Sequence, residues 1–158
     1  MSMQDAIKAA ILKRHQSFGF LRQDGKWGYH QLPVFFELRI GTGRTQGAEQ
    51  RIDAFALHPY PSLGHHRTAY EIKVSRSDFL RELKKPNKRR AALRFSNEFY
   101  FIAPPAIIHR SEVPLECGLI EVGTDGIGAV VVPAPCRDSM PPTWGFIASI
   151  IGRVSGGK

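Results

Sequence analysis

Cysteine is scarce in this sequence and a long apolar run is missing, and each absence argues against a class of protein. The two cysteines, Cys117 and Cys136, form no CxxC pair, so a zinc site or a dithiol redox centre has little support and both are expected to be reduced thiols. No apolar run approaches the roughly 18 residues of a membrane helix, and the N-terminus does not have the pattern of a signal peptide. We therefore expect a soluble, cytoplasmic protein with no membrane partner.

Internal repeats and composition breaks are also missing, which favours one domain. The chain has 158 residues, of which 42% are hydrophobic, and a chain of this size buries enough surface for a core without disulfides or structural metal. We expect a single domain over residues 1–154 and a frayed tail at 155–158.

Positive charge is plentiful and concentrated in one segment. The formal net charge is +8, and the segment from Arg76 to Arg94 holds eight cations against two acids. Such a segment favours a polyanionic partner, although a basic helix is also often only a solvated face.

Apolar spacing predicts helices and strands in an order typical of an α/β domain. Residues 18–33 and 58–67 are rich in turn-forming residues and predict loops. We expect the strand–helix–strand segment from 68 to 104 to be a right-handed crossover joining two parallel strands, within a mixed central sheet flanked by helices. The expected helices are 3–17, a segment from Ser75 to Phe95 interrupted at Pro86, and 143–153; the expected strands are 34–40, 51–57, 68–74, 98–104, 118–122 and 126–132.

The pattern acid-x-Lys occurs three times, and its context separates one occurrence from the other two. Asp24-Gly-Lys26 lies in a turn and Glu82-Leu-Lys84 on a helix, and both are ordinary solvated settings. Glu71-Ile-Lys73 lies in an expected strand, where the period of two places Glu71 and Lys73 on one face and their neighbours on the other.

Asp53 is a lone acid among apolar residues in the expected strand 51–57. Strand centres disfavour aspartate, and burying it without a partner is costly. If the two strands are neighbours, Asp53 and Glu71 can hold a hard divalent cation, Mg²⁺ or Mn²⁺, with Lys73 beside them. The residues alone leave this metal site and a structural acid–lysine ion pair equally open.

The segment RIDAFAL followed by YEIKVSRSDF, with Glu71 placed 18 residues after Asp53, resembles the Asp…Glu-x-Lys signature of the PD-(D/E)xK nuclease superfamily. Within that superfamily the chain looks most similar to small MmcB-like DNA-repair and phage-type proteins. The resemblance covers residues 34–104 and implies a restriction-endonuclease-like fold. It also implies that Asp53, Glu71 and the carbonyl of Ile72 are metal ligands, with Lys73 as the water-positioning or charge-stabilising group.

The superfamily often adds a glutamate from its first helix, and here the nearest candidate is Glu37, which is either a metal ligand or a surface acid of an edge strand. The implied function is a metal-dependent nuclease that hydrolyses DNA in repair or phage DNA processing. A non-cleaving nucleic-acid-binding module is the alternative, as is a subunit of a larger complex in which a partner or a second copy supplies specificity. Phosphate contacts are expected from the basic helix, at Lys84, Lys85, Lys88, Arg89 and Arg90.

Two further groups have ordinary explanations. The aromatic residues Trp27, Tyr29, Phe35 and Phe36 are expected to be core rather than base-stacking residues. His58, His65 and His66 are expected to be loop histidines rather than metal ligands.

Overall fold

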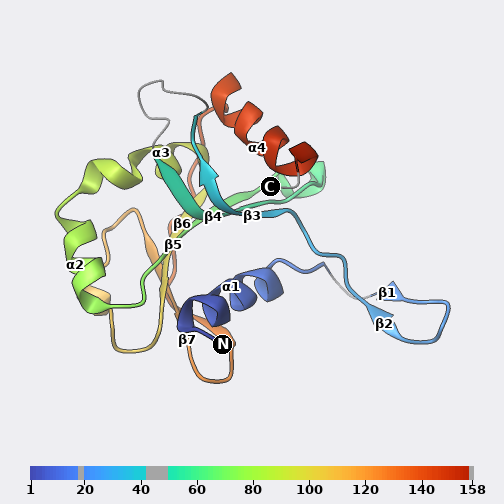
Figure 1. Ribbon diagram of the computed structural model, residues 1–158, viewed down its shortest axis with the longest axis horizontal. Coiled ribbons are helices and arrows are strands. Elements are labelled where there is room, and N and C mark those ends of the chain that lie inside the picture. The colour runs from blue at the N-terminus through green and yellow to red at the C-terminus, as the bar shows by residue number, and fades with distance from the viewer. Residues whose placement is uncertain (18–19, 42–49, 157–158) are drawn as a thin grey trace.

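A six-stranded mixed sheet flanked by helices forms the body of the protein in a computed structural model, which describes residues 1–17, 20–41 and 50–156 (Figure 1). The strand order is β3-β4-β5-β6-β7-β8, with antiparallel pairs at β3–β4, β4–β5 and β7–β8 and parallel pairs at β5–β6 and β6–β7. The strands are β3 (Val34–Arg39), β4 (Arg51–Leu57), β5 (Arg67–Ile72), β6 (Glu98–Ala103), β7 (Gly118–Val122) and β8 (Gly128–Val132). The expected mixed α/β sheet and its parallel crossover pair are confirmed.

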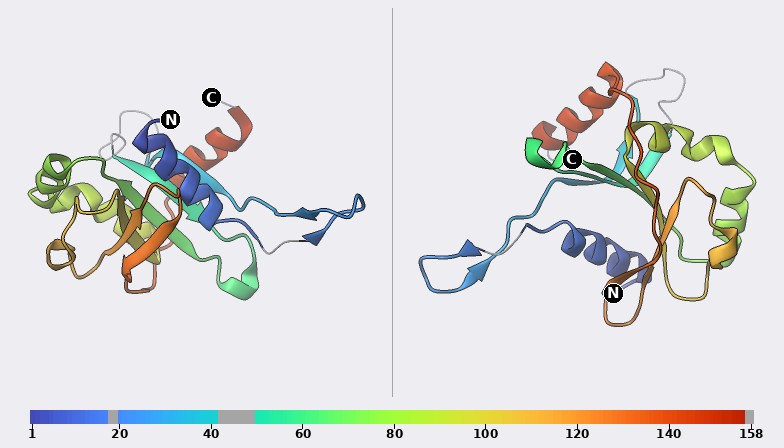
Figure 2. Two further views of the ribbon diagram at one scale, coloured as in Figure 1. Left: turned by 90° about the horizontal axis from the view of Figure 1, so that it is seen from below. Right: turned by 180° about the vertical axis from the view of Figure 1, so that it is seen from behind.

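Helices cover both faces of this sheet and divide the core in two. Helix α1 (Met3–Arg14) covers one face through Ile7 and Ile11, which pack against Tyr70 and Ile102. The other face carries α2 (Arg76–Leu83), α3 (Arg90–Phe95) and α4 (Trp144–Gly156), which contribute Phe79, Phe95 and Phe146 (Figure 2). Apolar side chains alternate between the two clusters along most of the strands, for example at Ala54, Phe55 and Ala56 of β4.

Helix α1 is shorter than predicted. Its start is held by a capping box in which Ser2 Oγ accepts a hydrogen bond from the Asp5 N–H at 3.1 Å and Asp5 Oδ2 accepts one from the Ser2 N–H at 3.2 Å. It ends at Arg14 because the next residues pair with a later segment: the carbonyl of His15 accepts from the Leu32 N–H at 2.9 Å. Main-chain pairing therefore ends the helix at Arg14, although the sequence pattern predicted a helix through residue 17.

The expected loop 18–33 contains a two-stranded hairpin, β1 (Phe20–Leu21) and β2 (Trp27–Gly28), which projects from the body (Figures 1 and 2). Gly25 turns this hairpin with a φ of 76°, a conformation that glycine adopts without strain. Trp27 and Tyr29 are 67% and 61% exposed, so the expectation that they are core residues is wrong.

The basic segment folds as predicted around Pro86. Ser75 caps α2 by accepting a hydrogen bond from the Asp78 N–H at 3.3 Å. The helix ends at Leu83, a 3-10 turn follows over Pro86–Arg89, and α3 begins at Arg90. Two shorter 3-10 turns lie at Pro61–Leu63 and Arg110–Glu112.

The end of the chain differs from the expected frayed tail. Helix α4 extends to Gly156, so two of the four tail residues are helical, and residues 157 and 158 lie outside the described part. Among the helices of the described ranges, none has the length and apolar character to cross a membrane.

Candidate active site

Asp53 on β4 and Glu71 on β5 meet where the two strands stop pairing. The last paired residues toward this end are Ala54 and Tyr70, and continuing the register by one residue places Asp53 opposite Glu71. Here Asp53 Oδ2 accepts a hydrogen bond from the main-chain N–H of Ile72 at 2.9 Å. A carboxylate thus supplies the acceptor for this N–H, and this bond fixes the Asp53 side chain between the strands.

The two faces of β5 carry the expected side chains. Tyr70 and Ile72 pack in the core beneath α1, whereas Glu71 and Lys73 point to the opposite face, where Lys73 bonds to Glu82 of α2 and Glu71 lies near Lys88 of the turn Pro86–Arg89. Lys73 follows the last residue of β5, and its N–H donates to the carbonyl of Ile102 on β6 at 3.0 Å. The prediction that Glu71 and Lys73 share one sheet face is confirmed.

Five charged side chains form what we call the acid–lysine cluster: Asp53, Glu71, Lys73, Glu82 and Lys88. Lys73 Nζ lies 2.8 Å from Glu71 Oε1 and 3.3 Å from Glu82 Oε2. Lys88 Nζ lies 3.1 Å from Glu82 Oε2 and 3.8 Å from Glu71 Oε1. Three carboxylates therefore face two ammonium groups, so the cluster has a net charge of −1 when all five groups are ionised.

Burial sets the protonation behaviour of this cluster. Glu71 is 8% exposed, and its burial together with the nearby Asp53 carboxylate raises its pKa to about 7. Burial also raises the pKa of Asp53, against the effect of the hydrogen bond from Ile72. Burial acts to lower the pKa of Lys73, but its ion pairs with Glu71 and Glu82 outweigh this, and the pKa rises. Lys73 is thus a cation at neutral pH, whereas Glu71 is poised between its two states.

Glu82 is the residue that sequence reasoning missed. It was assigned to a solvated helix surface, but its side chain is buried at 4% exposure, and its Oε1 is buried with no hydrogen-bond partner among the described residues. The signal was present in the spacing, because Glu82 follows the buried Phe79 by three residues and therefore lies on the same face of α2.

Glu37 lies outside the acid–lysine cluster. Its φ of 52° is left-handed, which breaks the alternation of β3 so that Phe36 packs beneath α1 while Leu38 packs on the opposite face. The Glu37 side chain is exposed, and its carbonyl accepts a hydrogen bond from Arg153 at 2.7 Å.

The cluster holds three carboxylates, Asp53, Glu71 and Glu82, but they are not arranged as a three-ligand metal site. Within residues 1–17, 20–41 and 50–156, no group of three His, Cys, Asp or Glu side chains is arranged to hold a metal ion. Of its two expected roles, Glu37 therefore matches the surface acid of an edge strand and not the metal ligand. Asp53 and Glu71 remain as the candidate ligand pair.

Four of the five predicted phosphate-binding residues are exposed beside this site, namely Lys84, Lys85, Lys88 and Arg90. Arg89 is the exception and a correction, because only 6% of it is exposed. Its guanidinium lies 5.9 Å from the centre of the Phe101 ring and 3.7 Å from Glu116 Oε1. Arg89 is on the inward side of its turn and is not available to a polyanion.

Comparison of the chain with protein-family models, curated proteins and solved structures finds no match in any of the three. The chemistry of the site is therefore argued from its own residues. Paired carboxylates on neighbouring strands provide hard oxygen ligands for a divalent cation. The adjacent lysine provides a fixed positive charge and hydrogen-bond donor, and the exposed cations of the 84–90 segment provide attraction for a polyanion.

Proposed function

We propose that this protein is a metal-dependent nuclease that hydrolyses DNA phosphodiester bonds at Asp53, Glu71 and Lys73. The observation that carries the proposal is the convergence of these three side chains at the point where β4 and β5 separate, with Asp53 held by the Ile72 N–H. A structural ion pair needs one acid and one lysine, whereas this cluster holds an excess of buried carboxylate, which is costly for stability.

The order of elements supports the same proposal. Helix α1, the antiparallel strands β3, β4 and β5, the helical segment α2–α3 and the parallel strand β6 follow one another in the chain. This is the order expected for a restriction-endonuclease-like domain, and Asp53 and Glu71 occupy its second and third strands.

The residues present fit a divalent cation. Burial raises the pKa values of Asp53 and Glu71, and the charge of Asp53 adds to the rise at Glu71. A bound cation would favour the ionised form of both. Asp53 and Glu71 would hold Mg²⁺ or Mn²⁺, with the Ile72 carbonyl as the further ligand that the superfamily resemblance implies. When bound, the metal would supply a Lewis acid for the phosphoryl oxygen and lower the pKa of a coordinated water.

The protein's own groups then have distinct tasks. Because the pKa of Lys73 is raised, its ammonium keeps its proton and acts as a hydrogen-bond donor and positive charge, not as a general base. It would orient the attacking water and stabilise the charge that develops on the phosphoryl group. Glu71 and Glu82 both contact the Lys73 ammonium, so its position is fixed before substrate binds.

The decisive experiment compares cleavage of single-stranded, duplex and branched DNA with Mg²⁺ or Mn²⁺ and with EDTA. We expect metal-dependent cleavage that Asp53→Asn abolishes and that the matched control Asp24→Asn, in the projecting hairpin, leaves intact. Lys73→Ala should abolish cleavage while preserving DNA binding. Cleavage by Lys73→Ala at the wild-type rate would refute the assignment.

A non-cleaving nucleic-acid-binding module is the second candidate, and the ion pairs that already engage Glu71 and Glu82 favour it. Salt-sensitive DNA binding without cleavage on any substrate, with either metal, would select it over the nuclease. Cleavage that appears only after a partner protein is added would instead identify a subunit of a larger complex.

A further inference from the structure

A cavity of about 440 Å³ lies between α3 and the start of α4, and we call it the α3–α4 cavity. Its polar lining comes from three parts of the chain: Asn87 and two arginines of the basic segment, Gln50 beside β4, and Thr143 before α4. Among the described residues, its lining holds no aspartate or glutamate. The described side chains of the cavity therefore favour an anion.

The two arginines, Arg90 and Arg94, have unbalanced charges. They are four residues apart on α3, so they lie on the same helix face, where like charges repel. Both are exposed, and in the part of the chain that the structure describes neither side chain has a hydrogen-bond or ion-pair partner. Most other charged groups nearby are paired, as Lys88 is with Glu82. An anion between these two guanidinium groups would remove their repulsion.

The size and donors of the cavity favour a phosphate group. A guanidinium presents a planar fork of N–H donors that matches two phosphate oxygens, and two such forks satisfy a tetrahedral anion better than a flat carboxylate. The amides of Asn87 and Gln50 add neutral donors at the wall. Helix α4, which starts after Thr143 and runs for 13 residues, directs the positive end of its dipole toward the same space and adds to this preference.

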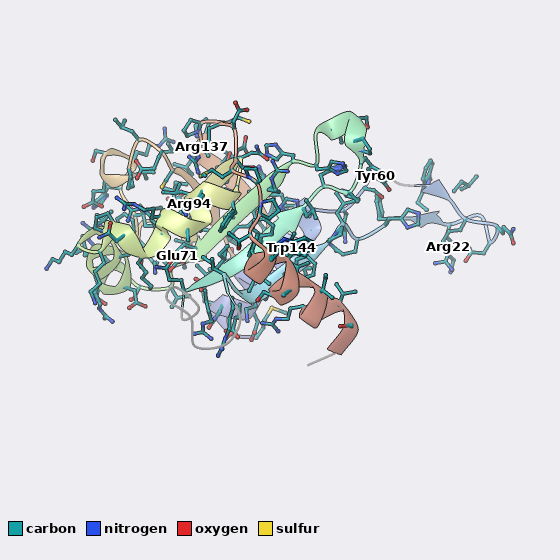
Figure 3. All side chains as sticks on the ribbon, turned by 90° about the horizontal axis from the view of Figure 1, so that it is seen from above. Arg22, Tyr60, Glu71, Arg94, Arg137 and Trp144 are labelled. Carbon is teal, nitrogen blue, oxygen red and sulfur yellow. The ribbon has the colours of Figure 1, made fainter. Side chains whose placement is uncertain are left out.

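Two short segments of the chain connect the lining of the cavity to the acid–lysine cluster. Asn87 directly precedes Lys88, whose Nζ lies 3.8 Å from Glu71, and Gln50 stands three residues before Asp53 on β4. In Figure 3, Arg94 and Glu71 lie on the same side of the molecule, whereas Arg22 lies at its far end on the projecting hairpin. A nucleic-acid strand that crosses the cluster would therefore pass the cavity with a neighbouring phosphate.

We propose that the α3–α4 cavity binds a phosphate group of the nucleic-acid strand through Arg90 and Arg94. The identity of the strand as substrate rests on the proposed nuclease function, whereas the binding itself does not require cleavage. The phosphate is either an internal phosphodiester or the phosphate at the end of a strand, and these two sources share the same chemistry.

The test measures binding of a fluorescent single-stranded DNA oligonucleotide in EDTA, where no cleavage occurs, over a series of salt concentrations. The variants are Arg90→Gln, Arg94→Gln and their combination, and Arg22→Gln in the projecting hairpin is the control that removes the same charge elsewhere. We expect each cavity variant to weaken binding several-fold and to reduce the slope of log K against log salt by about 0.7, the value for one lost contact to single-stranded DNA. Arg94→Lys should restore the slope but only part of the affinity, because it keeps the charge and loses the fork.

Oligonucleotides with and without a 5′-phosphate distinguish the two sources. A preference for the phosphorylated strand that Arg94→Gln abolishes would assign the cavity to a strand end, and equal losses on both would assign it to an internal phosphodiester. Unchanged affinity and slope in the double variant would overturn the proposal, as would an equal loss in Arg22→Gln or failure of the unaltered protein to bind. Because cleavage is assayed separately with metal, a nuclease without this cavity contact and a binding protein without cleavage give different results.

Discussion

Protonation of Glu71 makes the free energy of unfolding fall as pH rises, which is the opposite of the usual effect of a carboxylate. Burial and the neighbouring Asp53 raise the pKa of Glu71 from its ordinary value of 4.5 to about 7 in the folded state. Between these values the folded chain binds more protons at this site than the unfolded chain, so stability falls as pH rises. A shift of about 2.5 pKa units corresponds to about 3 kcal/mol, present below pH 4.5 and lost as pH rises through 7.

His15 acts in the opposite direction over an overlapping range. Its burial, with a smaller effect of the adjacent Arg14, lowers its pKa from 6.5 to about 4, and its Nε2 lies 2.6 Å from the Tyr70 hydroxyl. The folded state therefore binds fewer protons at His15, and stability rises with pH between about 4 and 6.5. The two effects cancel in large part in the unaltered protein, so a flat stability profile would by itself decide nothing.

The variant Glu71→Gln separates the effects of Glu71 and His15 on stability, because His15 titrates in both proteins. The free energy of unfolding would be measured by urea denaturation in EDTA between pH 4.5 and 8, followed by far-UV circular dichroism because both tryptophans, Trp27 and Trp144, are exposed. We expect the two proteins to be equally stable near pH 4.5 and the variant to be more stable by about 3 kcal/mol at pH 8. A difference that is independent of pH, or that favours the unaltered protein at pH 8, would refute the reasoning about the buried charge.

Three further predictions concern stability and reactivity. Glu82→Ala should cost about 1.5 to 3 kcal/mol because it removes one of the two carboxylates that accept from buried Lys73, while Glu82→Gln should cost less because an amide oxygen still accepts from both lysines; equal losses in urea denaturation would contradict this. Cys136 is exposed, whereas burial raises the pKa of Cys117 to about 12, so a thiol reagent should label one cysteine in the native protein and two in denaturant. A Cβ on Gly118 would clash with the Tyr100 ring and lie 2.6 Å from the main-chain N of Ala134, so Gly118→Ala should lower stability by about 1 to 3 kcal/mol, and Gly152→Ala, where nothing lies within 4 Å, should not destabilise.

The sheet was largely predictable because its signals are local. The segments 51–57 and 118–122 match β4 and β7 at both ends, since apolar β-forming runs there are bounded by turn residues. The hairpin of residues 20–28 was not predictable from periodicity, because its strands are two residues long and mostly exposed. The early end of α1 was missed for a related reason: pairing of His15 with Leu32 is a contact between segments distant in sequence.

The same distinction between local patterns and contacts of distant segments explains which parts of the site were predictable. The shared face of Glu71 and Lys73 follows from the period of a strand, and the approach of Asp53 follows from neighbouring antiparallel strands. The burial of Glu82 could have been read from its spacing to Phe79 on α2, whereas the burial of Arg89 depends on how the turn after α2 packs against the sheet, which no local pattern encodes. The position of Glu37 depends on one left-handed φ at a residue that usually avoids it.

The charges around β4 and β5 match the two parts of the proposed substrate. When all five of its groups are ionised, the acid–lysine cluster carries one negative charge more than its lysines neutralise, and the described lining of the α3–α4 cavity holds two exposed arginines and no acid. The excess of buried carboxylate is costly for stability, and the two arginines repel each other on one helix face. A ligand that brings a divalent cation to the carboxylates and a phosphate to the arginines would satisfy both excesses at once. A metal-bound nucleic-acid strand has this composition, so loss of affinity in the Arg90 and Arg94 variants together with metal-dependent cleavage through Asp53 would account for the whole arrangement.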